Sequence, residues 1–277
     1  MFKITPGGTL TTLYSFCSPD TYPNCPDGTG PFAGLVQAAN GDFYGTTFYG
    51  GNFSPDAAPH GGGTIFKITA SGALTTLYAF CSQSLCTDGA NPFAGLVQAT
   101  DGNLYGAASK GGAYGQGTIF EIAPSPSDTL TTLYSFCSQG VYPDCTDGAV
   151  PGALVQGTNG TFYGATVYGG VDAPNSYCAY IAYECGTVFS LSTGLAPFVE
   201  TQPTSGKAGT VVTILGTDLT GASSISFNGV PAVFGVSSRP GNVTAIATVV
   251  PAGASTGTVE VVTPNGTLSS NVPFRVP

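Results

Sequence analysis

The chain has 277 residues, enough for one or two domains with hydrophobic cores of their own. Its formal net charge is −9, and only 8% of its residues are charged. Nucleic acids and anionic membrane surfaces attract basic proteins, so this composition argues against both as partners. No apolar run is as long as a transmembrane helix, so we expect no membrane span.

From its first residues the chain repeats a set of short strand-like segments. The clearest copy spans residues 63–106, where TIFKI and LTTLYAF form one hairpin and GLVQA and NLYGAA form a second. Asp101 and Gly102 lie between the last two segments, in a pair that suits a tight type I′ turn. Four antiparallel strands per repeat of this length are typical of a β-propeller blade.

The number of strands does not match whole repeats. One hairpin comes first, two complete sets and a further hairpin follow, and the TVFSL strand closes the series; these lie at residues 1–16, 34–80, 95–136, 152–165 and 187–191. Closed propellers have about four to eight blades, so we expect an open arc, a piece of a larger ring or an assembly completed by a partner. Exposed end blades would allow self-association.

Eight cysteines fall in four neighbouring pairs, three of them directly after an LYSF-type strand. Disulfides that close these loops are the favoured interpretation, and they imply an oxidising compartment. Each would contribute about 2–3 kcal/mol through loop closure, so its main effect would be to fix the shape of the loop. Metal binding by thiolates is the alternative, but the spacing does not match two converging C-x-x-C pairs. The pairs are Cys17 with Cys25, Cys81 with Cys86, Cys137 with Cys145, and Cys178 with Cys185.

The first residue already lies in a strand of the repeat. No export signal precedes it, although the cysteine pairs point to an oxidising compartment. We therefore expect a truncated chain or a start codon placed too late, and an extracellular or cell-surface location.

An aspartate followed by glycine comes after each of the first three cysteine loops. Asp27, Asp88 and Asp147 fit ordinary turn chemistry, which is the favoured interpretation. As alternatives, they are candidate calcium ligands or carboxylates of a glycosidase-like dyad. The spacing of an EF-hand loop is absent, and we expect no cofactor and no metal.

Tyrosines that precede glycine form a second recurring set. Tyr49 and Tyr168 come before Gly-Gly and variable loops, so we expect them to be exposed, as platforms on which sugar rings could stack. Tyr44, Tyr105 and Tyr163 are expected to pack between blades instead. His60 is the only histidine and is expected in an exposed loop, so it is a weak candidate for a catalytic base.

The pattern changes after residue 196. Residues 197–277 show short strands and no cysteine, which predicts a β-sandwich of immunoglobulin type. The ordered segments GTVVTILGT, FNGV, VPAGASTG and TPNG closely resemble an IPT/TIG domain. In that family the fold is an immunoglobulin-like sandwich, found in some DNA-binding transcription factors and in cell-surface proteins. The acidic, cysteine-rich context here fits the surface group.

Residues 1–196 resemble the GloVer tandem repeats of exported bacterial proteins, through the LYSF, DG, GLVQATDGNLYG, YGG and GTIFKI segments. No activity is generally assigned to that family. The predicted fold is thus all-β: a partial or small β-propeller of four-stranded repeats followed by an immunoglobulin-like β-sandwich.

The resulting functional hypothesis is a non-catalytic binding or adhesion module at the cell surface, with a glycan or protein as its partner. Two alternatives stay open. One is a propeller-type lyase or glycosidase that uses Asp27, Asp88 or Asp147. The other is a structural, self-assembling filament subunit in which the end strands of one chain complete the blade of the next.

Overall fold

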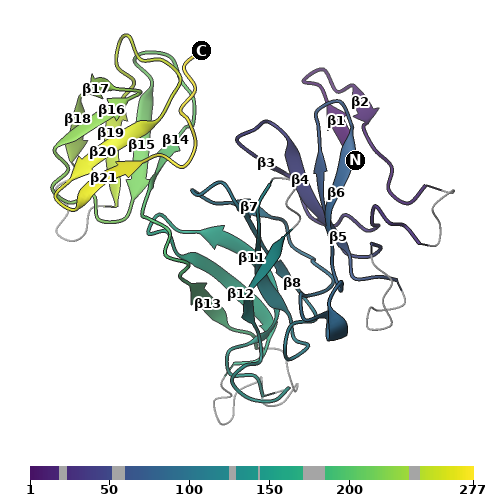
Figure 1. The fold of residues 1–277 in the computed structure, drawn as a ribbon. Coiled ribbons are helices and arrows are strands. Elements are labelled where there is room, and N and C mark those ends of the chain that lie inside the picture. Colours follow the sequence, from purple (N-terminus) through teal and green to yellow (C-terminus); the bar gives the residue numbers. More distant parts are fainter. Residues whose placement is uncertain (19–23, 52–59, 125–128, 143, 171–184, 237–243) are drawn as a thin grey trace. The chain divides into compact units, whose positions relative to one another are not determined.

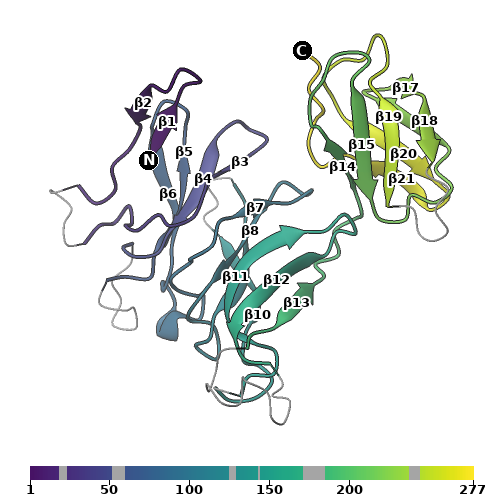
Figure 2. The ribbon, with the colours of Figure 1, turned by 180° about the vertical axis from the view of Figure 1, so that it is seen from behind.

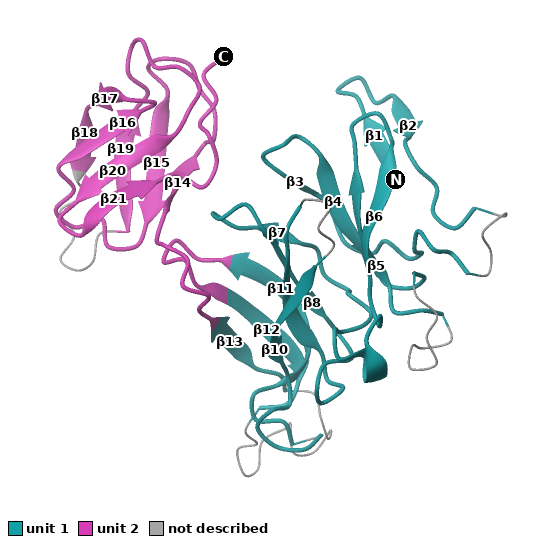
Figure 3. Ribbon diagram, viewed as in Figure 1, with its two compact units in different colours: residues 1–155, 163–190 teal, residues 156–162, 191–277 magenta. Residues whose placement is uncertain are grey.

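A computed structural model describes the whole chain except residues 19–23, 52–59, 125–128, 143, 171–184 and 237–243. It forms two compact units (Figure 3). One contains Met1–Val155 and Tyr163–Ser190, and the other contains Gln156–Phe162 and Leu191–Pro277. The short turn at Gln156–Phe162 therefore belongs with the C-terminal unit, although it lies within the repeats.

The described residues form strands and no α-helix, which confirms the predicted all-β class. In the part of the chain that the structure describes, nothing helical has the length and hydrophobicity that a membrane crossing requires. The repeat region contains β1 (Phe2–Ile4), β2 (Leu10–Thr12), β3 (Val36–Gln37), β4 (Phe43–Thr47), β5 (Thr64–Ile68), β6 (Leu74–Ala79), a 3-10 turn (Ser84–Cys86), β7 (Val97–Gln98), β8 (Leu104–Ala108), β9 (Thr118–Ile122), β10 (Leu130–Ser135), β11 (Ala149–Gln156), β12 (Phe162–Tyr168) and β13 (Val188–Leu191).

Two complete sheets of four strands follow one another in the repeat region. Their orders are β3-β4-β5-β6 and β7-β8-β9-β10, and neighbouring strands within each sheet pair antiparallel (Figure 1). The predicted four-stranded repeat is therefore confirmed. A two-stranded sheet, β1-β2, precedes these sheets, and a three-stranded sheet, β11-β12-β13, follows them (Figure 2).

A glycine and a phenylalanine face each other across the middle of each complete sheet. Gly45 pairs with Phe66, and Gly106 pairs with Phe120. A Cβ atom added at Gly106 would lie 2.5 Å from the Phe120 ring, so the ring occupies the space that a side chain would fill. An aromatic ring that covers a strand glycine restores the packing that the glycine lacks. Glycine is therefore required in the repeated Tyr-Gly pair.

The same phenylalanines contact the preceding sheet. Phe80, which follows β6, meets Phe120 of β9 edge to face, with 5.2 Å between the ring centroids. Edge-to-face contact is a favoured geometry for aromatic pairs. Equivalent contacts at 5.0 Å join Phe16 to Phe66 and Phe136 to Phe189. Each sheet is thus joined to the next by the same pair of rings.

The hairpin turn at Asp101 and Gly102 differs from the predicted type I′ turn. A type I′ turn needs positive φ at both central residues. Gly102 has a φ of 87°, but Asp101 is not left-handed. The Gly102 N–H donates to the Ala99 carbonyl, and the Ala99 N–H donates to the Asn103 carbonyl. These bonds define a three-residue loop that ends in a left-handed glycine, and the Asp101 carboxylate accepts the Asn103 N–H at 3.0 Å.

The C-terminal unit is a sandwich of two four-stranded sheets, as predicted. Their orders are β14-β15-β19-β18 and β17-β16-β20-β21, and their buried side chains form one core. Phe227 and Phe274 meet edge to face within that core, with 5.1 Å between ring centroids. The strands are β14 (Val199–Gln202), β15 (Val211–Gly216), β16 (Ser224–Phe227), β17 (Val230–Ala232), β18 (Phe234–Val236), β19 (Ala245–Val249), β20 (Val259–Thr263) and β21 (Gly266–Ser269).

Two details of the sandwich differ from the strand pattern of its sequence. The VPFRV segment at residues 272–276, whose sequence predicts a strand, forms only isolated bridges at Phe274 and Arg275. The segment Val199–Gln202, which the sequence pattern did not single out, supplies β14 at the edge of a sheet. At Asn228 and Gly229 both φ angles are positive, which is the type I′ geometry.

Candidate functional site

Disulfide-closed loops follow β2, β6 and β10. Cys17 pairs with Cys25, Cys81 with Cys86, and Cys137 with Cys145, which confirms three of the predicted bridges. The proposed pair of Cys178 with Cys185 lies outside the described residues, since Cys178 is among those not described. Within the described ranges, no group of three or more potential metal-binding side chains gathers in one place. For these six cysteines the structure supports the disulfide interpretation.

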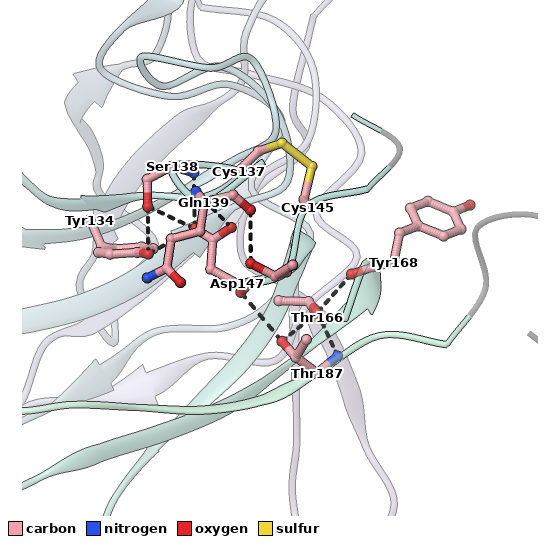
Figure 4. The surroundings of a disulfide bond; sticks show 10 residues. Tyr134, Cys137, Ser138, Gln139, Cys145, Asp147, Thr166, Tyr168 and Thr187 are labelled. Atoms are coloured by element: carbon pink, nitrogen blue, oxygen red, sulfur yellow. Dashed lines mark hydrogen bonds between the residues drawn. A yellow bond between two sulfur atoms is a disulfide. The ribbon is translucent and has the colours of Figure 1, made fainter. Parts of the chain in front are cut away.

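Asp147 follows the third disulfide loop, just after Cys145, and Figure 4 shows its contacts. One of its carboxylate oxygens accepts hydrogen bonds from the Tyr134 hydroxyl at 2.7 Å and from the N–H and hydroxyl of Ser138 at 2.9 Å each. The other oxygen accepts the Gln139 N–H at 3.3 Å. The carboxylate therefore ties the loop that follows β10 to a tyrosine on β10 itself.

The other two loop aspartates make the same kind of contact. Asp88, which is fully buried, accepts the Tyr78 hydroxyl at 2.8 Å and the Ser82 N–H at 2.9 Å. Asp27 accepts the Tyr14 hydroxyl at 2.9 Å and the Cys17 N–H at 3.0 Å. The three candidate aspartates thus hold equivalent loops. A role for them toward a ligand stays a prediction.

The tyrosine partners of these aspartates were not singled out by the sequence pattern. They precede the junction phenylalanines by two residues in every copy, which is the signal that could have identified them. Burial and then the Asp88 carboxylate raise the pKa of Tyr78 to about 12, although Ser82 opposes the shift. Burial and the aspartate partners also raise the pKa values of Tyr14 and Tyr134. All three hydroxyls therefore remain protonated donors near neutral pH.

The pKa of Asp147 is lowered in the folded protein. Burial alone would raise this pKa, but hydrogen bonds from Tyr134, from Ser138 and from the Gln139 backbone outweigh burial and lower it. A carboxyl group that is easier to ionise in the folded state stabilises the fold once it is ionised. The charged form of Asp147 is thus the one that holds the loop.

Each disulfide loop is also held by a Gly-Gly pair, which binds the second cysteine of the loop. The second glycine of each pair donates its N–H to the carbonyl of the second cysteine, at 2.9 Å in all three copies. A Cβ at Gly111 would lie 2.4 Å from the Cys86 carbonyl, so the first glycine permits this close approach. The three bonds run from Gly51 to Cys25, from Gly112 to Cys86 and from Gly170 to Cys145.

Tyr49 and Tyr168 were expected to be exposed, but both are half-buried. Tyr168 packs against the cluster of Cys137, Cys145 and Ala149 beside the third disulfide. The centroid of the Tyr49 ring lies 4.6 Å from that of Phe48 and 5.6 Å from that of His60. The loops packed beside both tyrosines cover surface that the sequence pattern assigned to solvent.

The tyrosines expected between sheets behave in two ways. Tyr44 and Tyr105 are buried, with exposed fractions of 0% and 2%, as expected. Tyr163 is 37% exposed, although it holds the equivalent position on β12. The Tyr44 hydroxyl donates to the Pro124 carbonyl beyond β9, at 3.3 Å, so Tyr44 packs toward the following sheet. Tyr163 lies in the last of the repeat sheets that the structure describes.

An exposed aromatic cluster, made up of Phe32, Phe48, Tyr49 and Phe93, lies where the first two complete sheets meet. Phe32 and Phe93 are 62% and 59% exposed, and their ring centroids are 5.9 Å apart. The Phe48 ring meets both edge to face, with centroid distances of 5.7 Å to Phe32 and 6.1 Å to Phe93. The signal in the sequence is the repeated PFAG segment, which becomes PGA in the third copy. This cluster is the candidate binding surface.

The acid sensitivity of the fold tests the role of Asp147. Because its pKa is lowered in the folded state, its stabilising effect is fully present above the ordinary carboxyl pKa of about 3.9. That effect is lost as the pH falls through the lower, folded value. In urea unfolding from pH 7 to pH 3, Asp147→Asn should be less stable than the native chain at pH 7. The difference should shrink below about pH 4.

The exposed Asp144, within the third disulfide loop, offers a matched control, Asp144→Asn. A stability difference for Asp147→Asn that stays constant down to pH 3 would contradict the assignment.

A second test concerns a threonine pair. The hydroxyls of Thr47 and Thr64 share a buried contact at 2.8 Å, and those of Thr166 and Thr187 share a partly buried one at 2.9 Å. In the middle copy Ala108 takes the place of the first threonine, and the Thr118 hydroxyl is buried without a hydrogen-bond partner among the described residues. Ala108→Thr should raise the free energy of unfolding by about 1 kcal/mol through the restored hydrogen bond.

Ala108→Val has nearly the same shape but no hydroxyl, so the difference between the two variants in denaturant unfolding isolates the hydrogen bond. Equal stabilities of the two variants would refute the prediction.

Comparison with known families agrees with this geometry. The family model for the Gloeobacter/Verrucomicrobia repeat matches residues 1–178, and the model for the IPT/TIG domain matches residues 198–276. No curated protein matches the chain at a significant level. IPT/TIG domains often serve as binding or adhesion modules. The chain belongs to the family of Gloeobacter/Verrucomicrobia repeat proteins, and its C-terminal region is an IPT/TIG domain.

Proposed function

We propose that this protein is a non-catalytic binding module that acts outside the cytosol and captures its ligand on the aromatic cluster. The observation that supports this most is the exposure of Phe32 and Phe93, which together present two adjacent rings to solvent. Large apolar side chains that gather on a surface mark interaction sites more often than single exposed ones do. Phe48 meets both rings edge to face, and Tyr49 in turn meets Phe48 edge to face.

The chemistry of the cluster favours a glycan. Its four rings carry no charge, and Tyr49 adds a hydroxyl group. Sugar rings have apolar faces that stack on aromatic side chains, while polar groups around them fix the orientation. A protein ligand is the alternative partner for the same surface.

The loop aspartates favour binding over catalysis. An acid or base must be free to exchange a proton with its substrate. Asp88 is buried, and Asp88 and Asp147 each accept hydrogen bonds from a tyrosine, a serine and a loop N–H. Using either one as an acid or base would disrupt the loop that it holds. A propeller-type lyase or glycosidase is therefore the less favoured candidate.

The location is proposed from the disulfides. Three bridges close short loops in the described part of the chain, and disulfides persist mainly in oxidising compartments. The IPT/TIG domain would then serve as a spacer or as a second adhesive module. A self-assembling structural subunit is a further candidate, because apolar faces are exposed at both ends of the repeat region.

The binding surface is tested by a double variant, Phe32→Ala with Phe93→Ala. Both side chains are more than half exposed, so the fold should survive while binding falls at least tenfold, the equivalent of about 1.4 kcal/mol. The measurement is binding of the native chain and the variant to a glycan array and to isolated cell-wall polysaccharide.

Leu85→Ala with Val141→Ala is the matched control, because both residues are exposed apolar side chains on disulfide loops. Binding that survives the Phe32 and Phe93 double variant would rule out the cluster. Release of reducing ends from the polysaccharide would favour the enzyme alternative.

A further inference from the structure

The aromatic cluster lies at the junction between the two complete sheets, which we call the aromatic junction. The next junction joins the second complete sheet to the sheet β11-β12-β13 and contains an equivalent backbone contact. The Asn91 N–H donates to the Gly62 carbonyl at the aromatic junction, and the Val150 N–H donates to the Gln116 carbonyl at the next one. Asn91 and Val150 both have left-handed φ angles, of 55° and 58°. The two junctions can therefore be compared position by position.

The next junction forms without the full set of aromatic rings. Ser109 takes the place of Phe48 and is buried. The PFAG segment, which supplies Phe32 and Phe93, becomes PGA in the third copy, so that only the equivalent of Phe32 is aromatic there. Since the junction forms without the other two rings, the fold does not require them. Exposed aromatic side chains that the fold does not require are typical of a binding surface.

Two buried polar side chains hold Phe93 against the first complete sheet. The side-chain amide of Asn91 donates to the Phe48 carbonyl at 2.8 Å, and the Thr46 hydroxyl donates to the Ala94 carbonyl at 3.1 Å. Asn91 and Thr46 are each only 2% exposed. Because Phe93 lies between Asn91 and Ala94 in the sequence, the two bonds fix its position relative to the Phe48 ring.

The next junction has neither of these side-chain bonds. Val150 holds the position of Asn91, and Ala107 holds the position of Thr46. Neither valine nor alanine has a side-chain donor. The two polar side chains therefore occur where the rings occur. Rings that are already held in place lose less conformational freedom when a ligand binds, so such bonds favour binding.

The two exposed rings suit two linked sugar units better than one. The centroids of Phe32 and Phe93 are 5.9 Å apart, and the ring planes are inclined by 40°. One sugar ring cannot stack flat on two inclined faces. The centroid distance is close to the length of one sugar unit in an extended glycan, and successive units can turn about the glycosidic bonds that join them. Each ring can therefore take one unit of the same glycan chain.

The charge of the protein disfavours an acidic glycan. The chain has a net charge of −9 and only six lysine and arginine residues. The four aromatic residues of the cluster, together with Asn91 and Thr46, carry no charge. Recognition of carboxylate or sulfate groups relies on basic side chains, and a net negative charge repels an anionic polymer. An uncharged glycan is therefore the better match.

We propose that the aromatic cluster binds an uncharged glycan as a chain, with one sugar unit stacked on Phe32 and the next on Phe93. Asn91 and Thr46 are the positioning residues that hold Phe93 at the required spacing. This inference rests on the proposed function and adds the class of glycan, its minimum length and the residues that set the spacing. Two linked units that occupy both rings bind together, so affinity should rise from the single sugar to the disaccharide.

The test is NMR titration of the full chain, which measures weak binding as well as strong. The probes are cello-, manno- and xylo-oligosaccharides from the single sugar to the hexamer, with oligogalacturonides as the acidic counterpart. In at least one neutral series the disaccharide should bind on the order of tenfold more tightly than the single sugar. Phe32→Ala or Phe93→Ala alone should remove this difference, and the oligogalacturonides should bind more weakly than the neutral series.

The positioning residues are tested by the ratio of disaccharide to single-sugar affinity. Asn91→Gly removes the amide but keeps a residue that adopts the left-handed backbone freely. Thr46→Ala introduces the residue found at the equivalent Ala107. Each variant should lower the ratio, whereas a loss of folded protein would lower both affinities equally and leave the ratio unchanged. Val150→Gly, at the equivalent position of the next junction, is the matched control and should not change the ratio.

Each way of failing has its own result. Binding that survives the Phe32 and Phe93 double variant would contradict the proposed function itself. If that double variant loses binding, the proposed function stands. This inference would still be overturned by equal affinity for single sugar and disaccharide, by a preference for oligogalacturonides, or by no binding to any neutral series. A ratio unchanged in both Asn91→Gly and Thr46→Ala would overturn the positioning role.

Discussion

The repeat region depends on one contact, a phenylalanine ring that lies over a strand glycine and meets a second phenylalanine from the preceding sheet. Phe120 fills the space beside Gly106 within its own sheet and contacts Phe80 across the junction. One side chain thus packs the interior of a sheet and joins it to its neighbour. Both rings are fully buried, so burial of their apolar surface adds to the edge-to-face contact.

This contact also fixes the start of each disulfide loop. The junction phenylalanine is followed at once by the first cysteine, and the tyrosine two residues before it points to the loop aspartate. The core therefore already fixes the start of each loop. The disulfide, the aspartate carboxylate and the hydrogen bond from the Gly-Gly pair then hold the rest of it. The exposed aromatic cluster, beside the two complete sheets, is the surface with the clearest binding chemistry.

The sequence predicted what depends on local pattern. Alternation and turn residues placed β5 at its observed bounds, and the pairing of neighbouring cysteines followed from their repeated position after the same strand. The predicted turn type at Asp101 and Gly102 was wrong, because an Asp-Gly pair fits both a two-residue turn and a longer loop that ends in a left-handed glycine. At Asn228 and Gly229 both φ angles are left-handed, so a similar pair gives the shorter turn there.

Side-chain burial and contacts between residues far apart in the sequence could not be predicted from local pattern. Tyr49 and Tyr168 are half-buried because other parts of the fold pack beside them, which a local pattern does not show. The Tyr134 and Asp147 contact spans the disulfide loop, so neither residue identifies the other in the sequence. Tyr163 is exposed and Tyr44 is buried at equivalent positions, so the repeat sequence alone does not determine their burial. The aromatic cluster combines residues from three separate segments and is visible only in the fold.

The most direct test of this account is a double-mutant cycle between Phe80 and Phe120, using leucine at each position and denaturant unfolding as the readout. If the ring contact joins the sheets, the two changes should be coupled by about 0.5–1.5 kcal/mol, with the double variant less destabilised than the sum of the single variants. Effects that add to within about 0.3 kcal/mol would show that the rings act independently and would contradict the account.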